Sequence, residues 1–181
     1  MKTVVSIRKG QVLILFIVVG LIIFASVPSI VHGSTTTTFQ PSAADNYLRQ
    51  DAATNYGGAQ LVEVQSRDTH RNRRTILKFD MSTIPPGATV ISATLSLYYY
   101  DILGTVPTNR PYWVYRITQT AWTELGSTWN TYDGTNSWSS PGGGGDYATT
   151  DAASATVPGS YGWMNWPVTA QVQYAVNNVR N

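Results

Sequence analysis

Strict alternation of apolar and polar residues is clearest over residues 91–100. The odd positions carry apolar or aromatic residues and the even positions carry Ser, Thr or Tyr: Ile91, Ala93, Leu95, Leu97 and Tyr99 against Ser92, Thr94, Ser96, Tyr98 and Tyr100. Successive side chains of a β-strand point to opposite faces, so the pattern predicts a strand whose odd residues are buried. Weaker alternation over residues 112–118 and 161–168 predicts two further strands.

Shorter segments between turn signals predict the rest of the fold. Three strand candidates are bounded by turns and by a loop containing Pro85 and Pro86: residues 45–50, 59–67 and 73–81. Apolar residues recur at helical spacing after Thr169, which predicts one short helix near the C-terminus with Thr169 as its N-cap. Together these elements predict an all-β protein, an antiparallel β-sandwich over residues 45–181.

The first 33 residues have the pattern of an export signal. Three basic residues come before the apolar run of residues 12–25, and Val31 and Gly33 stand where a signal-peptidase site requires small or apolar residues. This predicts a cleaved signal peptide, and hence a secreted or cell-surface protein. Two alternatives stay open: a membrane anchor that extends to Val31, and a prepilin-like signal that is cut after Gly10. The Thr-rich residues 34–44 are a linker or a first edge strand.

Charge and cysteine content narrow the function classes. The chain carries twelve Lys or Arg and ten Asp or Glu residues, but three of the basic residues and none of the acidic ones lie in residues 1–33. Nine basic and ten acidic groups remain, a formal charge of −1, which argues against nucleic acid as a partner. A membrane partner is expected only through the N-terminal segment. The chain has no cysteine, so it is not a disulfide scaffold.

Residues suited to catalysis are scarce. Cysteine is absent, His70 is the single histidine beyond residue 33, and no serine stands in a G-x-S-x-G context. The sequence therefore predicts a non-catalytic module, with a carboxylate pair brought together by folding as the enzymatic alternative. Asp residues near predicted turns could hold a structural calcium ion, but no spacing is diagnostic, and turn-forming Asp is the favoured interpretation.

Two groups of side chains are candidates for ligand binding. The basic cluster lies within residues 67–78: Arg67, His70, Arg71, Arg73, Arg74 and Lys78. Guanidinium groups pair bidentately with carboxylates, so the cluster suits a carboxylated or sulfated sugar, unless it is only a solvated hairpin. The aromatic group lies in the loop-like residues 122–147: Trp122, Trp129, Tyr132 and Trp138. These rings either stack on sugars or pack the long loop onto the sheet.

Four ordered blocks resemble a known domain. They are "ADNYLRQDAATNYGG", "RTILKFDMSTIPPGATVISATLSLYYY", "VYRITQTAWTELGSTWN" and "GWMNWPVTAQVQYAV". Together they are similar to the DNRLRE-type module, carbohydrate-binding module family 96, over about residues 39–179. The resemblance implies a jelly-roll-like sandwich that binds polysaccharide, above all an acidic one such as alginate. It also implies contacts from the basic residues at the Leu-x-Phe-Asp block: Arg67, Arg71, Arg73, Arg74 and Lys78.

The sequence departs from the family pattern at two places, and the second departure supports another hypothesis. Pro167 stands where the family usually has Asp, and the chain ends at Asn181 without the final apolar strand that commonly follows the helix. A sheet that lacks a strand exposes unpaired backbone groups, which a strand from a neighbouring copy could pair with. Combined with a prepilin-like signal, this favours a structural cell-surface or filament-forming subunit that self-associates by strand exchange.

Overall fold

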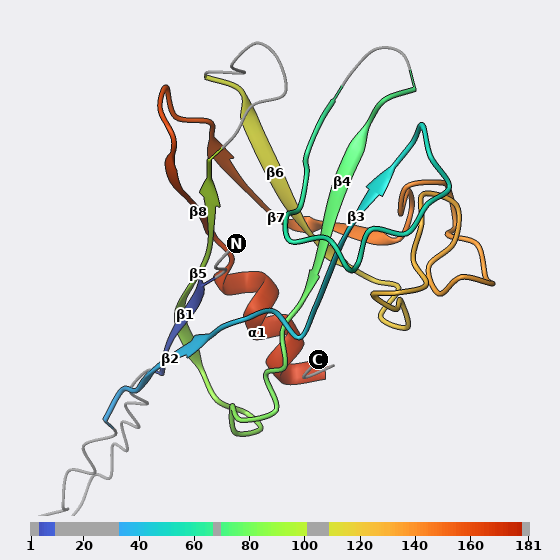
Figure 1. The fold of residues 1–181 in the computed structure, drawn as a ribbon. Helices are drawn as coiled ribbons and strands as arrows, with labels where there is room; N and C mark the ends of the chain where they lie inside the picture. Colours follow the sequence, from blue (N-terminus) through green and yellow to red (C-terminus); the bar gives the residue numbers. More distant parts are fainter. Residues whose placement is uncertain (1–3, 10–32, 67–69, 101–108, 179–181) are drawn as a thin grey trace, which may run out of the picture.

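The computed structural model describes residues 4–9, 33–66, 70–100 and 109–178, which form eight strands and one helix. The strands are β1 (Val4–Lys9), β2 (Thr36–Phe39), β3 (Ala44–Arg49), β4 (Arg73–Lys78), β5 (Val90–Tyr99), β6 (Pro111–Ile117), β7 (Tyr147–Thr156) and β8 (Gly162–Pro167), and the helix is α1 (Thr169–Asn178). The antiparallel strands form a four-stranded sheet of order β2-β1-β5-β8 and two pairs, β3-β4 and β6-β7 (Figure 1). The predicted all-β class with one short helix is confirmed, although the sheets do not close into a complete sandwich.

β5 forms where the alternation predicted it, with one correction at its start. Leu95 is buried as expected, but Ile91 is 49% exposed and Val90 is buried instead. The register with β1 explains this, because the pairing passes from Ser92 to Val90 and skips Ile91. Such a β-bulge shifts the alternation by one residue, so the predicted burial of Ile91 is wrong.

The main core lies between the β5–β8 pair, the β6–β7 pair and α1. Leu95 and Met164 reach it from β5 and β8, and Val172 reaches it from the helix. Trp166 of β8 is buried in the same cluster and donates a hydrogen bond from Nε1 to the carbonyl of Tyr112 in β6, at 2.8 Å. The core-facing sides of the two strand pairs are therefore joined by a hydrogen bond as well as by apolar packing.

Helix α1 begins at Thr169, but its N-cap is Val168, whose carbonyl accepts the first helical bond from the N–H of Val172 at 3.0 Å. The predicted N-cap role of Thr169 is therefore wrong. The Thr169 hydroxyl accepts a hydrogen bond from the backbone N–H of Ala93 at 3.0 Å, which ties the helix to β5. Val168, just before the helix, is buried in the main core. Among the described residues, no helix has the length and apolar character needed to cross a membrane.

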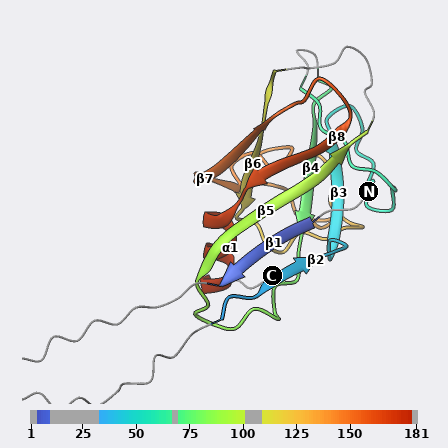
Figure 2. The same ribbon diagram turned by 90° about the vertical axis from the view of Figure 1, so that its left-hand side faces the viewer.

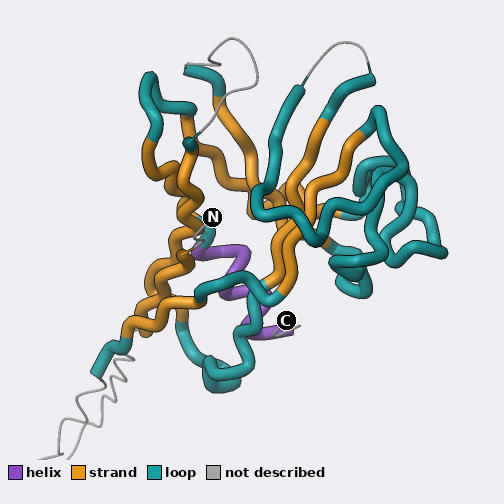
Figure 3. The backbone as a smooth tube through the Cα atoms, viewed as in Figure 1, coloured by secondary structure: helices purple, strands orange, loops and turns teal. Residues whose placement is uncertain are grey.

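A second core lies against the other face of the β3–β4 pair. There the completely buried Leu48 packs with three tryptophans of the loop between β6 and β7: Trp122, Trp129 and Trp138. This loop, residues 118–146, lies beside β3 (Figure 3). Ile76 of β4 packs on this second core, whereas its neighbour Leu77 packs on the main core. Both faces of the β3–β4 pair are therefore covered.

The strand predicted over residues 59–67 does not form in the described part of that segment. Gln65 makes one isolated bridge with Arg73, and the rest runs as a loop. Two backbone bonds join Gln65 to Arg73, and Thr75 adds a side-chain bond from its Oγ1 hydrogen to the carbonyl of Glu63 at 3.0 Å. Without a continuous backbone ladder there is no strand, and this prediction is wrong.

The N-terminal segments join the large sheet. Thr36–Phe39 forms β2, so of the two interpretations of residues 34–44 the edge strand is the correct one. Val4–Lys9 forms β1, which lies between β2 and β5 and pairs with both (Figure 2). The predicted apolar signal run, residues 12–25, lies outside the described residues. Export and cleavage of the signal stay predictions.

Candidate functional site

Lys78 of the basic cluster is bound to the backbone of the tryptophan loop. Its Nζ donates to the carbonyls of Thr120, at 3.1 Å, and Trp122, at 3.3 Å, and lies 5.0 Å from the centroid of the Trp122 ring. A cation over an indole face is attracted to the negative face of the ring. Lys78 therefore holds the loop on β4.

Two arginines of the basic cluster also have partners within the chain. Arg74 donates from Nη1 to the carbonyl of Gly142 at 2.8 Å, and its guanidinium lies 5.3 Å from the centroid of the Trp129 ring. Arg73 forms an ion pair with Glu63, and its side chain is only 15% exposed. These contacts favour the structural interpretation of Arg73 and give Arg74 a packing role, although Arg74 remains exposed.

Two further members of the basic cluster, His70 and Arg71, lie at the end of the β3–β4 pair. His70 and Arg71 are exposed, and His70 Nδ1 lies 3.4 Å from Nε2 of Gln50. Arg67 lies outside the described residues. Arg73, Arg74 and Lys78 are bound to other parts of the protein, so the described residues of the basic cluster do not form a single exposed binding surface.

The predicted aromatic group is mostly inside the protein. Trp122, Trp129 and Trp138 are 2%, 8% and 4% exposed, and Tyr132 is half-buried with its ring edge-on to Trp138 at 5.9 Å. Trp138 also donates from Nε1 to the carbonyl of Thr128 at 2.9 Å. Burial leaves these indole faces no room for a sugar, and it fits the interpretation that they pack the loop onto the sheet.

A buried polar network fixes the same loop from the β3 side. Asn46, with no exposed surface, donates from Nδ2 to the carbonyl of Ser127 at 2.8 Å and to its Oγ at 2.7 Å, and its Oδ1 accepts from the N–H of Tyr56. Asn55 donates to the carbonyls of Ser127, at 2.7 Å, and Glu124, at 2.6 Å. These bonds satisfy loop carbonyls that water cannot reach easily.

An exposed aromatic strip on the β6–β7 pair was not among the predicted site residues. Trp113, Tyr115 and Tyr147, which we call the β6–β7 strip, are 54%, 41% and 41% exposed. The ring centroids of Trp113 and Tyr115 are 6.3 Å apart with an interplanar angle of 21°, and those of Tyr115 and Tyr147 are 4.9 Å apart. Three adjoining exposed rings form a continuous apolar surface on an otherwise polar face.

Alternation along β6 explains why these rings face solvent. Tyr112 and Val114 pack against the main core, so Trp113 and Tyr115 point to the opposite side. On β7, Ser154 lies opposite Trp113, so the strip is bordered by a hydroxyl residue. The sequence signal was ambiguous, because aromatic residues occupy both the odd and the even positions of this strand.

The comparison with known families decides the ligand class. The model of carbohydrate-binding module family 96 matches residues 35–181. The chain belongs to this family. A search of curated proteins gives no match. The predicted relationship to carbohydrate-binding module family 96 is confirmed, and the chain is therefore a carbohydrate-binding module, a class that is typically non-catalytic.

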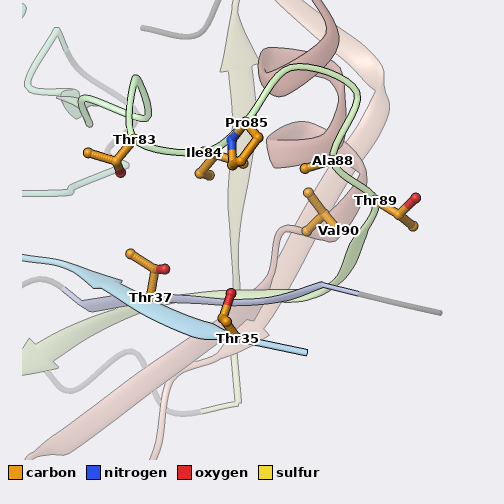
Figure 4. A pocket seen from close by; sticks show the side chains of 8 residues that line it. All are labelled: Thr35, Thr37, Thr83, Ile84, Pro85, Ala88, Thr89 and Val90. Carbon is orange, nitrogen blue, oxygen red and sulfur yellow. The ribbon is translucent and has the colours of Figure 1, made fainter. Parts of the chain in front are cut away.

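Two hollows in the described surface of this family 96 module are small. One, of about 160 Å³, lies between Thr37 of β2 and the loop around Pro85 (Figure 4), and the other, of about 90 Å³, lies beside Asp45 and Leu61. Pockets that enclose small ligands usually measure roughly 300–1,000 Å³. A polysaccharide is therefore better accommodated along an open face, such as the β6–β7 strip, than in either hollow.

Aspartate side chains in the turns of the module accept hydrogen bonds from nearby backbone N–H groups. Asp133 Oδ1 accepts from the N–H groups of Thr135 and Asn136, and its Oδ2 accepts from Nδ2 of Asn136. The side-chain bond from Asn136, followed by the backbone bonds, holds the pKa of Asp133 below its ordinary value. Within the described residues, no three His, Cys, Asp or Glu side chains come together as metal ligands.

Proposed function

We propose that this module binds a polysaccharide chain across the β6–β7 strip by stacking of sugar rings on Trp113, Tyr115 and Tyr147. The observation that carries the proposal is the continuity of three exposed rings in a carbohydrate-binding module. Pyranose rings present apolar C–H faces that pack on aromatic rings. Aromatic side chains supply this area with few torsions to freeze, and Ser154 beside Trp113 can bond sugar hydroxyls.

The charge around the strip favours a neutral glycan. The strip consists of one tryptophan and two tyrosines and contains no Asp, Glu, Lys, Arg or His. Arg116 of the same strand is engaged by Asp151 at 2.7 Å and by the ring of Tyr174. A chain of neutral sugars can therefore lie on the strip without leaving a charge unpaired. We expect the specificity to come from ring stacking and hydroxyl contacts.

An acidic polysaccharide such as alginate is the second candidate ligand. The exposure of His70, Arg71 and Arg74 favours it, because guanidinium groups at the end of the β3–β4 pair can meet a carboxylate. The bond from Arg74 to Gly142 uses one of the five donors of a guanidinium group. This site is distinct from the β6–β7 strip, so the two candidates call for different variants.

Affinity electrophoresis in gels that contain a soluble β-glucan or alginate tests both candidates. Trp113→Ala should weaken glucan retardation, with a Kd about tenfold higher, equivalent to about 1.4 kcal/mol. Leu125→Ala is the matched control, because Leu125 is 75% exposed and lies in another part of the surface. Retardation by alginate alone, reduced by Arg71→Ala with Arg74→Ala and unchanged by Trp113→Ala, would overturn the neutral-glycan proposal in favour of the second candidate.

We also propose that the module acts outside the cell, as a secreted or surface-attached protein. In residues 1–33, basic residues come first, an apolar run follows, and small or apolar residues stand before the expected cleavage site; this order supports export. N-terminal sequencing of the exported protein is the direct test: a terminus near Ser34 supports signal cleavage, and a terminus at Gln11 supports the prepilin-like alternative.

A further inference from the structure

A second exposed aromatic surface lies on the β5–β8 pair. Tyr98 and Trp163 are direct cross-strand partners, 40% and 47% exposed, with ring centroids 5.3 Å apart at an interplanar angle of 84°. We call this pair the β5–β8 patch. Edge-to-face contact stabilises the pair and leaves part of each ring in water.

The patch is not needed by the core. Along β8 the buried Met164 and Trp166 alternate with the exposed Trp163 and Asn165, so Trp163 points away from the main core. Adjoining exposed aromatic rings that internal packing does not require form a contiguous apolar patch of the kind found at binding surfaces. The same alternation places Tyr98 outward on β5.

Along the β5–β8 pair, the described residues that border the patch are polar and uncharged. Next to the aromatic pair, Ser96 lies opposite Asn165 and donates from Oγ to its Oδ1 at 2.6 Å, and Thr94 lies opposite Pro167. Hydroxyl and amide groups beside an exposed indole match a sugar ring, which offers an apolar face and a rim of hydroxyl groups.

The patch and the β6–β7 strip face away from the same core on two different sheets. Trp166 and Tyr112, joined by a hydrogen bond, lie on the inward sides of β8 and β6, whereas Trp163 and Trp113 lie on the outward sides. One glycan segment on the strip therefore does not occupy the patch. Two surfaces of similar chemistry on opposite sides of one core can hold two segments at once.

We propose that the β5–β8 patch is a second carbohydrate-binding surface, so that one module bridges two segments of the same polysaccharide. The proposal rests on the proposed function of the β6–β7 strip, because bridging needs both surfaces. Bivalent attachment raises the affinity for a long chain above that of either surface alone, since the second contact is made at high effective concentration.

Binding and cross-linking of a soluble β-glucan, with alginate as a parallel probe, test the bridge. Wild-type protein should cross-link the polymer and so increase its light scattering. At excess protein the scattering should fall again, because each polymer segment then carries its own module and bridges no longer form. Trp163→Ala and Trp113→Ala should each abolish cross-linking and raise the Kd for the long polymer about tenfold or more. With a short oligosaccharide of the same glucan, calorimetry should give two sites for wild type and one for each variant.

Controls separate the bridge from other causes. Light scattering without polymer must give the monomer mass, because a dimer with one site per copy would also cross-link. Tyr98→Ala should reproduce Trp163→Ala, and Leu125→Ala should behave as wild type. The urea midpoints of these surface variants should match that of wild type, because none of the substituted side chains belongs to a core.

The outcomes distinguish the two proposals. If Trp113→Ala weakens binding while Trp163→Ala and Tyr98→Ala bind and cross-link like wild type, the bridge is overturned and the proposed function stands. If the polymer is bound but Trp113→Ala has no effect, the proposed function of the strip fails, and the bridge fails with it. If wild type binds neither probe, both proposals fail.

Discussion

Lys78 lies over the indole of Trp122 and donates to the carbonyl of the same residue at 3.3 Å, with its Nζ 5.0 Å from the ring centroid. This contact joins the most conspicuous charged segment of the sequence to its tryptophan-rich loop. A cation of the predicted ligand site is thereby part of the packing that holds the loop in place.

Lys78→Met should lower the free energy of unfolding by about 1–2 kcal/mol. The variant keeps much of the apolar stem but loses two hydrogen bonds and the cation–π contact. Urea unfolding measures the change. Arg110→Met is the control, since Arg110 is exposed and makes no ion pair within the described residues. Loss of alginate binding at unchanged stability would show instead that Lys78 serves a ligand.

Gly142→Ala should destabilise the loop by roughly 2 kcal/mol or more. Gly142 has φ +75°, and a Cβ at this position would lie 2.6 Å from the Trp129 ring, so the added methyl group meets both backbone strain and a clash. Gly159→Ala is the matched control, because a Cβ added there would meet nothing within 4 Å and its φ is not in the left-handed region. Equal urea midpoints for the two variants would contradict the proposed packing of Trp129.

Asn46→Ala should cost about 2–4 kcal/mol of stability. The substitution leaves the buried carbonyl of Ser127 and the N–H of Tyr56 each without one of its partners. Asn130→Ala, at an exposed position of the same loop, should change stability by no more than about 0.5 kcal/mol. Thermal unfolding of the two variants provides the comparison, and a small effect of Asn46→Ala would mean that the network is not important for stability.

The Asp133 turn should make stability fall at acid pH. The folded pKa of Asp133 is lowered by its bonds from Asn136 and Thr135, so its contribution is complete above the ordinary value of 3.8 and is lost as pH falls through the lower folded pKa. Wild type should therefore be more stable than Asp133→Asn above about pH 5, and the difference should shrink below the ordinary value. Urea midpoints from about pH 2.5 to 6 test this, and a pH-independent difference would refute it.

Removal of residues 1–33 should weaken the large sheet. β1 pairs with both β2 and β5, so a chain that starts at Ser34 leaves facing backbone groups on two strands unpaired. We expect a lower urea midpoint, restored by a synthetic peptide of residues 4–9. If the midpoint is unchanged, β1 contributes nothing to stability. If the shortened chain forms oligomers that this peptide dissociates, strand exchange between copies gains support.

The candidate site was only partly predictable from sequence. The basic cluster and the loop tryptophans were visible, but the main partners of Lys78 and Arg74 are backbone carbonyls 42 to 68 residues away, and a carbonyl leaves no signature in the sequence. The strip around Trp113 was missed because Tyr112 and Trp113 are both aromatic. A period of two identifies two faces and does not say which one is covered.

Local patterns were sufficient for the all-β class, for β5 and for helix α1, because hydrophobic period and turn residues act over a few positions. They failed at Ile91, where pairing with β1 introduces a bulge, and over residues 59–66, where backbone pairing with β4 is limited to one isolated bridge at Gln65. Which aromatic rings stay in water was decided by tertiary structure alone. Burial depends on what packs above a face, and here that covering comes from segments distant in the chain.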